Sequence, residues 1–185
     1  MTDDGSAFQR AIDALAPGGT LKLTKPSKKY AISTEIIIQK KINISGDGWT
    51  TVVRANSNNM TSVFHVQAGG DRTSFSNFRL EGSKSGVGGI PQRGIYFNGA
   101  KYGLVRNVLF SGPIAGTGLN FGVDVNGVNS GSTQIIFNRF ERLVSSTGNG
   151  VAVLIEASNF NQVLNNIIDG LEFNNANGAP GAAIF

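Results

Sequence analysis

Cysteine is absent from this 185-residue sequence, and histidine occurs once, as His65. Without thiols the chain forms no disulfide bonds and offers no thiolate ligands to a metal. A single histidine likewise excludes the multi-histidine sites that hold zinc in many enzymes. We therefore expect neither a metal site nor an organic cofactor.

Charged residues are also scarce, at 15% of the chain. No apolar run approaches the roughly 20 residues of a membrane-spanning helix, and no signal peptide is visible, so we expect no membrane insertion. The G-x-S-x-G, H-E-x-x-H, P-loop and Rossmann motifs are all missing. Six lysines lie between Lys22 and Lys41, but no run of aromatic residues interleaves with them as in single-strand binders. We therefore expect no nucleic-acid partner.

Glycine is abundant, with 25 residues, and two short phrases recur through the chain. The first phrase occupies residues 75–82, 105–112, 135–142 and 163–170, with copies 30, 30 and 28 residues apart. The second reads Gly-apolar-x-apolar at residues 94–97, 122–125, 150–153 and 181–184, and residues 64–66 open that series without the glycine. From Phe64 through Ile95, Val123 and Val151 to Ala182, its steps are 31, 28, 28 and 31 residues. Two phrases repeating in phase predict one unit stacked on copies of itself.

Each period contains at least two strands and no helix, so equivalent strands must stack in parallel as coils of a β-solenoid, with about 28–31 residues per coil. Strand alternation places three apolar columns inside. They are Phe75, Val105, Ile135 and Val163; Leu80, Phe110, Phe140 and Ile168; and Ile95, Val123 and Val151. A fourth column, Asn77, Asn107 and Asn165 with Phe137 interrupting, is interpreted as a structural asparagine ladder at a bend.

The start of the chain differs from the rest. Phe8, Ala11, Ile12 and Leu15 share one face at helical spacing, and Asp3 or Asp4 can cap the helix. We expect one all-β domain over residues 1–185, with a capping helix at 4–16 and coils over 20–185. Because the sequence stops inside a recurring strand, we also expect it to be the N-terminal portion of a longer β-helix.

Four segments near the N-terminus carry a family resemblance. They are T-D-D-G-S-A-F-Q-R-A-I-D-A at 2–14, G-G-T-L at 18–21, Y-A-I-S at 30–33 and I-N-I-S-G-D-G at 42–48. This opening resembles that of the pectate-lyase-like single-stranded right-handed β-helix superfamily, which is common in bacteriophage tailspikes and capsule depolymerases. The resemblance implies a right-handed parallel β-helix, a polysaccharide substrate and the association of three copies. It also implies a place in the virion tail if a phage encodes the chain.

Carboxylates are the first candidates for chemistry. If the second apolar column points inward, the residues that follow it point outward as a column of Glu81, Ser111, Glu141 and Asp169. Glu141 and Asp169 would then lie on adjacent coils, and glycoside hydrolysis needs such a pair of acids. Glu81 is a further candidate for one of the two catalytic acids. Arg79 and Arg139 share this face and are candidates to bind an acidic sugar. The alternative is that all of these are solvated charges.

A second outward column is a candidate sugar-stacking platform. It consists of His65, Tyr96, Asp124, Ala152 and Ala183, and the amides of Asn98 and Asn126 extend it. The alternative is an ordinary strand surface. Trp49 and Tyr102 are isolated aromatic residues to which the sequence assigns no partner.

Three functions follow from this pattern. The first is a tailspike-like β-helix that binds and hydrolyses a bacterial surface polysaccharide through Glu141 and Asp169. The second is a non-catalytic structural or receptor-binding module of the same fold. The third is a polysaccharide lyase, for which the sequence shows no clear basic residue beside a calcium-binding acid cluster.

Overall fold

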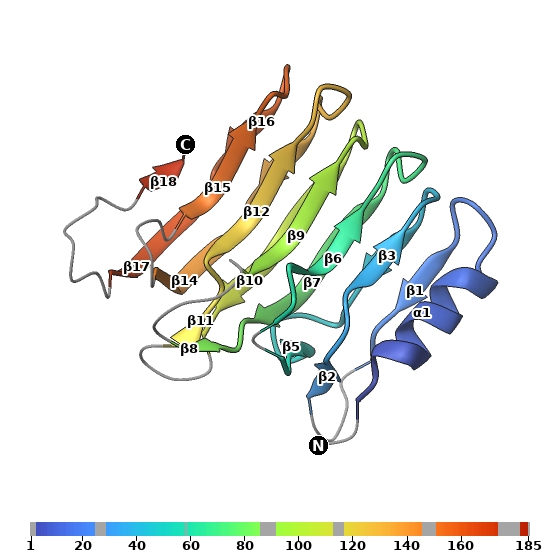
Figure 1. Cartoon of the computed structure of the whole chain (residues 1–185), viewed down its shortest axis with the longest axis horizontal. Coiled ribbons are helices and arrows are strands. Elements are labelled where there is room, and N and C mark those ends of the chain that lie inside the picture. The colour runs from blue at the N-terminus through green and yellow to red at the C-terminus, as the bar shows by residue number, and fades with distance from the viewer. Residues whose placement is uncertain are drawn as a thin grey trace.

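The structure is a computed structural model that describes residues 3–24, 29–57, 59–85, 92–112, 117–145, 151–173 and 182–184. These residues form a parallel β-solenoid of about four turns, with one short helix at its N-terminal end (Figure 1). The all-β class, the parallel stacking of coils and the N-terminal helix that the sequence predicts are therefore confirmed.

The strands form three faces, each built by stacking one segment from successive coils. The first face is a six-stranded sheet of β3 (Ile36–Ile38), β6 (Ser62–Val66), β9 (Arg93–Asn98), β12 (Phe121–Asn126), β15 (Val151–Glu156) and β18 (Ala182–Ile184). The second face contains β1 (Thr20–Lys22), β4 (Asn43–Ser45), the first halves of β7 (Ser74–Glu81) and β10 (Leu104–Ser111), β13 (Gln134–Ile136) and β16 (Gln162–Leu164). The third face contains β2 (Tyr30–Ile32), β5 (Val52–Ala55), the second halves of β7 and β10, β14 (Arg139–Ser145) and β17 (Ile167–Phe173). A separate antiparallel pair joins β8 (Lys84–Ser85) to β11 (Thr117–Gly118).

Two of the three predicted apolar columns are confirmed by the strand register. Phe75, Val105, Ile135 and Val163 pair in succession along the second face. Leu80, Phe110, Phe140 and Ile168 do so along the third. Phe110 and Phe140 stack with ring centroids 4.8 Å apart. Since like residues meet at the strand spacing, their side chains fill the interior with few gaps.

The third column follows the prediction only as far as Val123. Val123 pairs with Val153, so the predicted partner Val151 is wrong by two residues. The error arises because Gly150 was matched to Gly122. A Cβ atom on Gly122 would lie 2.5 Å from Cε1 of Phe140, so this position requires glycine, whereas its register partner in the next coil is Ala152.

The second face is bounded on both sides by bends at which one residue per coil has a positive φ. Toward the third face these residues are Asn77, Asn107, Phe137 and Asn165, with φ of 59°, 52°, 56° and 55°. Toward the first face they are Arg72, Tyr102, Ser132 and Phe160, with φ of 63°, 59°, 53° and 60°. Asparagine tolerates this left-handed conformation, whereas bulky aromatic residues rarely adopt it. The predicted asparagine column is thus a set of bend residues.

The asparagine ladder has a half-buried and a buried part. Asn107 Nδ2 donates to Asn77 Oδ1 at 2.8 Å, and both residues are half-buried. The fully enclosed asparagine is Asn138, which accepts a hydrogen bond from the backbone of Val108 and donates one to the carbonyl of Val105. The buried ladder is therefore offset by one residue from the predicted column.

Helix α1 (Gly5–Ala14) covers the N-terminal end of the stack and confirms the predicted capping helix (Figure 1). Asp3 Oδ1 accepts hydrogen bonds from the backbone of Gly5 and Ser33. Gln9 bonds to both backbone polar groups of Ile37 in β3, at 2.9 and 3.0 Å. The Gln9 amide therefore occupies the place of a further strand along β3.

Candidate functional site

The predicted acid pair is brought together on the third face. Glu141 and Asp169 occupy paired positions on the adjacent strands β14 and β17. Arg139 contacts both, with its Nε 2.5 Å from Glu141 Oε1 and its Nη2 2.9 Å from Asp169 Oδ2. Asp169 is exposed and Glu141 is partly exposed. The structure thus places two carboxylates one coil apart, joined by an arginine.

Glu81 does not face solvent, and the prediction that it does is wrong. Its side chain is only 1% exposed. Lys29, Arg54 and Arg79 all form ion pairs with it, at 2.8 to 3.1 Å. Burial raises the pKa of Glu81, but the hydrogen bond from Lys29 and the charges of Arg79 and Arg54 lower it by more, so the pKa is lowered overall. Arg79 is therefore engaged in this structural cluster.

The His65–Tyr96 part of the predicted platform is present on the first face. The two rings stack with centroids 4.8 Å apart. Glu35 Oε2 lies 3.0 Å from His65 Nδ1, and Asn98 Nδ2 lies 3.4 Å from His65 Nε2. Asn126 forms its hydrogen bond with Glu156. These side chains are thus held by neighbours on the same face.

Asp124 is fully buried, so its predicted role as an exposed sugar ligand is wrong. Arg93 forms an ion pair with it, and the Arg93 guanidinium lies over the rings of Tyr96 and Phe121, at 4.8 and 5.3 Å. Burial raises the pKa of Asp124 by more than Arg93 lowers it. In the next coil the register places Leu154 in this column in place of Ala152, and Val153 pairs with Ile184, so Ala183 does not continue the column either.

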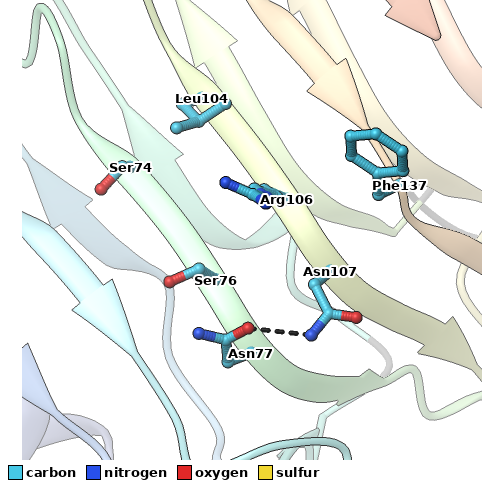
Figure 2. A pocket seen from close by; sticks show the side chains of 7 residues that line it. All are labelled: Ser74, Ser76, Asn77, Leu104, Arg106, Asn107 and Phe137. Atoms are coloured by element: carbon cyan, nitrogen blue, oxygen red, sulfur yellow. Dashed lines mark hydrogen bonds between the residues drawn. The ribbon is translucent and has the colours of Figure 1, made fainter. Parts of the chain in front are cut away.

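A groove that the sequence did not predict runs along the outside of the second face. It consists of two adjoining depressions of about 570 and 450 Å³, which share Ser74 and Leu104. The first is also lined by Ser76, Asn77, Arg106, Asn107 and Phe137. The second is also lined by Lys41, Asn43, Arg72, Tyr102, Gly103, Ser132 and Gln134. Figure 2 shows Arg106 and Asn107 between Phe137 and the strand that carries Ser74 and Ser76.

The edges of this groove carry exposed aromatic rings. Phe137 is 52% exposed and Tyr102 is 53% exposed, and both occupy bend positions with a positive φ. Trp49, which is 38% exposed, donates a hydrogen bond from its indole nitrogen to the carbonyl of Asn107 at 3.1 Å. The guanidinium of Arg72 lies 5.2 Å from the ring centre of Tyr102, and that of Arg106 lies 5.8 Å from the ring centre of Phe137.

The floor of the groove carries hydroxyl and amide groups beside Leu104, which lines both depressions. Ser74 Oγ donates to Asn43 Oδ1 at 2.8 Å. Asn107 donates to Asn77, also at 2.8 Å (Figure 2). Each amide uses only part of its hydrogen-bonding capacity in these contacts. The groove therefore combines aromatic edges with hydroxyl and amide groups.

Sequence reasoning missed the groove because its aromatic residues come from different coils. The available signal was the repetition of bend positions: Tyr102 lies 30 residues after Arg72, and Phe137 interrupts an asparagine column at the same period. Within the described ranges, no group of three His, Cys, Asp or Glu residues could hold a metal ion. No helix among the same residues is long and apolar enough to cross a membrane.

Comparison with known proteins identifies the fold alone. No family model and no curated protein matches the sequence. A solved structure, the ORF18 protein of Geobacillus virus E2, matches 90% of this chain with a TM-score of 0.55 and 20% sequence identity. This chain spans about 38% of the length of that protein. The chain thus shares a β-solenoid fold with a phage protein.

Proposed function

We propose that this chain is a tailspike-like β-helix module of phage origin that binds a bacterial surface polysaccharide along the groove of the second face. The observation that carries this proposal is the placement of Tyr102 and Phe137. Both rings are half exposed at left-handed bend positions, which cost of order 1–3 kcal/mol each for a non-glycine residue. Such strain without compensating burial is typical of residues that serve a function.

The chemistry of the groove suits a sugar polymer. Aromatic rings offer flat apolar faces against which the C–H faces of sugar rings pack, and the hydroxyls and amides between them can hydrogen-bond sugar hydroxyls. By contrast, the polar groups beside Tyr96 on the first face already bond one another. The groove is therefore a better binding site than the platform that the sequence predicts.

The test of binding is a comparison of three variants on a panel of purified bacterial capsular and O-antigen polysaccharides. Phe137→Asn and Tyr102→Asn keep a residue that tolerates the bend, and each should weaken binding about tenfold or more, as expected for the loss of an aromatic anchor. Tyr96→Ala should bind like the wild-type protein. If Tyr96→Ala alone loses binding, the ligand occupies the first face, and the groove proposal is wrong.

Hydrolysis by Glu141 and Asp169 is a second proposal, supported by their pairing on adjacent strands. Strands in a sheet lie about 4.8 Å apart, which is close to the roughly 5–5.5 Å between the carboxyl groups of retaining glycosidases. Phe137 in the groove and Arg139 in the acid cluster are two residues apart, so a polymer crossing this bend would meet both. This assignment predicts that the wild-type protein releases new reducing ends from the polysaccharide and that Glu141→Gln and Asp169→Asn do not.

The product distinguishes the remaining alternatives. An unsaturated uronate among the products would identify a lyase and would contradict hydrolysis. If the wild-type protein binds the polysaccharide but releases no new ends, the chain is a binding module, and Glu141 and Asp169 are surface charges.

A further inference from the structure

The groove is positively charged. Lys41, Arg72 and Arg106 line it, and no aspartate or glutamate is among the described residues that do so. In the Glu81 cluster and the Arg139 cluster, by contrast, the cations are paired with carboxylates. Within the described part of the chain, none of the three groove cations forms such an ion pair.

Two of these cations are held against aromatic rings. Arg72 lies over Tyr102 at one edge of the groove, and Arg106 lies over Phe137 at the opposite edge. In each pair the arginine comes from one coil and the ring from the next. A guanidinium stacked on a ring retains N–H groups around its edge, which can bind a carboxylate in a bidentate manner.

We infer that the groove selects an acidic polysaccharide, in which a sugar carboxylate binds to Arg106 or Arg72 while a neighbouring sugar packs against Phe137 or Tyr102. This inference rests on the proposed function and specifies the chemical class of its ligand. A sugar polymer fits better than a nucleic acid, because the space between the arginines is lined by serine hydroxyls and asparagine amides around Leu104, with no aromatic ring among these described residues. A single-stranded nucleic acid would instead favour successive stacking platforms along a basic track.

The experiment uses the same polysaccharide panel, with each acidic member also supplied after reduction of its carboxyl groups to alcohols. The polymers that bind should be acidic, and their reduced forms should bind about tenfold more weakly or worse, because a charge-assisted hydrogen bond is lost. Raising the salt concentration should weaken binding, since these cations are exposed to solvent.

Arg72→Gln and Arg106→Gln should reproduce the effect of carboxyl reduction. Both side chains are exposed, so circular dichroism should show that the variants remain folded. The matched control is Arg10→Gln, which removes an exposed arginine on α1, and it should bind like the wild-type protein.

The outcomes separate the inference from the proposed function. Equally tight binding of a neutral or carboxyl-reduced polymer would overturn the acidic-ligand inference while leaving polysaccharide binding intact. If a 30-nucleotide oligothymidylate probe binds more tightly than any polysaccharide, both proposals are wrong and the ligand is a nucleic acid. If the protein binds no member of the panel, both proposals fail.

Discussion

At the scale of single residues, the structure shows how basic side chains pair with buried carboxylates in a β-solenoid. Glu81 and Asp124 lie on strands whose alternation turns them away from the apolar interior, yet both are buried beneath basic side chains. Among the residues that the structure describes, three cations pair with Glu81, whereas Asp124 pairs with Arg93 alone. The shifts of their pKa values differ accordingly, downward for Glu81 and upward for Asp124.

Glu81→Gln should destabilise the fold by about 3 kcal/mol, the lower end for breaking a buried ion pair, because its three cations are partly hydrated. The lowered folded-state pKa means that Glu81 adds stability above its ordinary pKa of 4.5 and loses it as the pH falls through the lowered value. Urea unfolding should therefore show a large wild-type advantage at pH 7 that shrinks in acid. Glu156→Gln, at an exposed position, is the control. An equal loss in both variants would contradict this account.

Phe137→Asn should stabilise the protein by about 1 kcal/mol, because asparagine relieves the left-handed strain while little packing is lost from a half-exposed ring. The midpoint of urea unfolding measures this gain. Ile136→Asn, one residue earlier in extended β13, should show no gain. A loss of stability in Phe137→Asn as large as that in Ile136→Asn would mean that the ring has a structural role.

Sequence reasoning predicts the direction of a side chain better than its surroundings. Strand alternation predicts that Glu81 and Asp124 point away from the core. It does not predict that Lys29 covers Glu81 or that Arg93 covers Asp124, because neither cation belongs to a repeating phrase. The pair Glu141 and Asp169 was predicted because both members belong to one repeating phrase. The groove was not predicted, because Tyr102 lies outside the repeated phrases and Phe137 stands alone among asparagines.

At the scale of elements, columns of like residues determine the register of the coils. Phe75, Val105 and Ile135 could be aligned from sequence because each follows the same pattern of neighbours. Gly150 was misleading because a glycine in a short phrase fits several alignments. In the structure Gly122 lies against Phe140, where a Cβ atom would clash, and the register pairs Gly122 with Ala152 in the next coil.

Asn138→Leu should destabilise the protein by about 2 kcal/mol or more, since it removes the side-chain acceptor of the buried Val108 N–H and a donor to the Val105 carbonyl. Asn138 is 1% exposed, so water cannot easily replace the lost bonds. Gln134→Leu, which breaks an exposed side-chain bond to Gln162, is the control and should be close to neutral. Equal effects would show that burial of the ladder is not important for stability.

At the scale of the whole molecule, α1 protects the N-terminal end of the solenoid. The open edge of a parallel sheet can pair with another chain, and Gln9 blocks it by bonding to both polar groups of Ile37. Protection of this edge therefore depends on the Gln9 side chain, which bonds to β3 as a neighbouring strand would.

Gln9→Leu should accelerate hydrogen exchange at the Ile37 amide and promote concentration-dependent association. Exchange detected by NMR and sedimentation velocity measure the two effects. Arg10→Leu adds an apolar side chain to the exposed surface of the same helix without removing a bond to β3, so it should leave both properties unchanged. If Gln9→Leu remains monomeric with slow exchange at Ile37, the apolar contacts of α1 with β3 protect the edge by themselves.

The two rows of bend residues carry side chains that lie outside the apolar interior. Arginine, tyrosine, serine, phenylalanine and asparagine all occupy these positions, and none of their side chains is buried. Substitution there is limited by backbone conformation rather than by interior volume, so these side chains can vary while the apolar columns stay fixed. Because successive coils lie about 4.8 Å apart, each row places its residues at that regular spacing. A polymer whose repeating unit matches a multiple of that distance would present equivalent groups to successive bends.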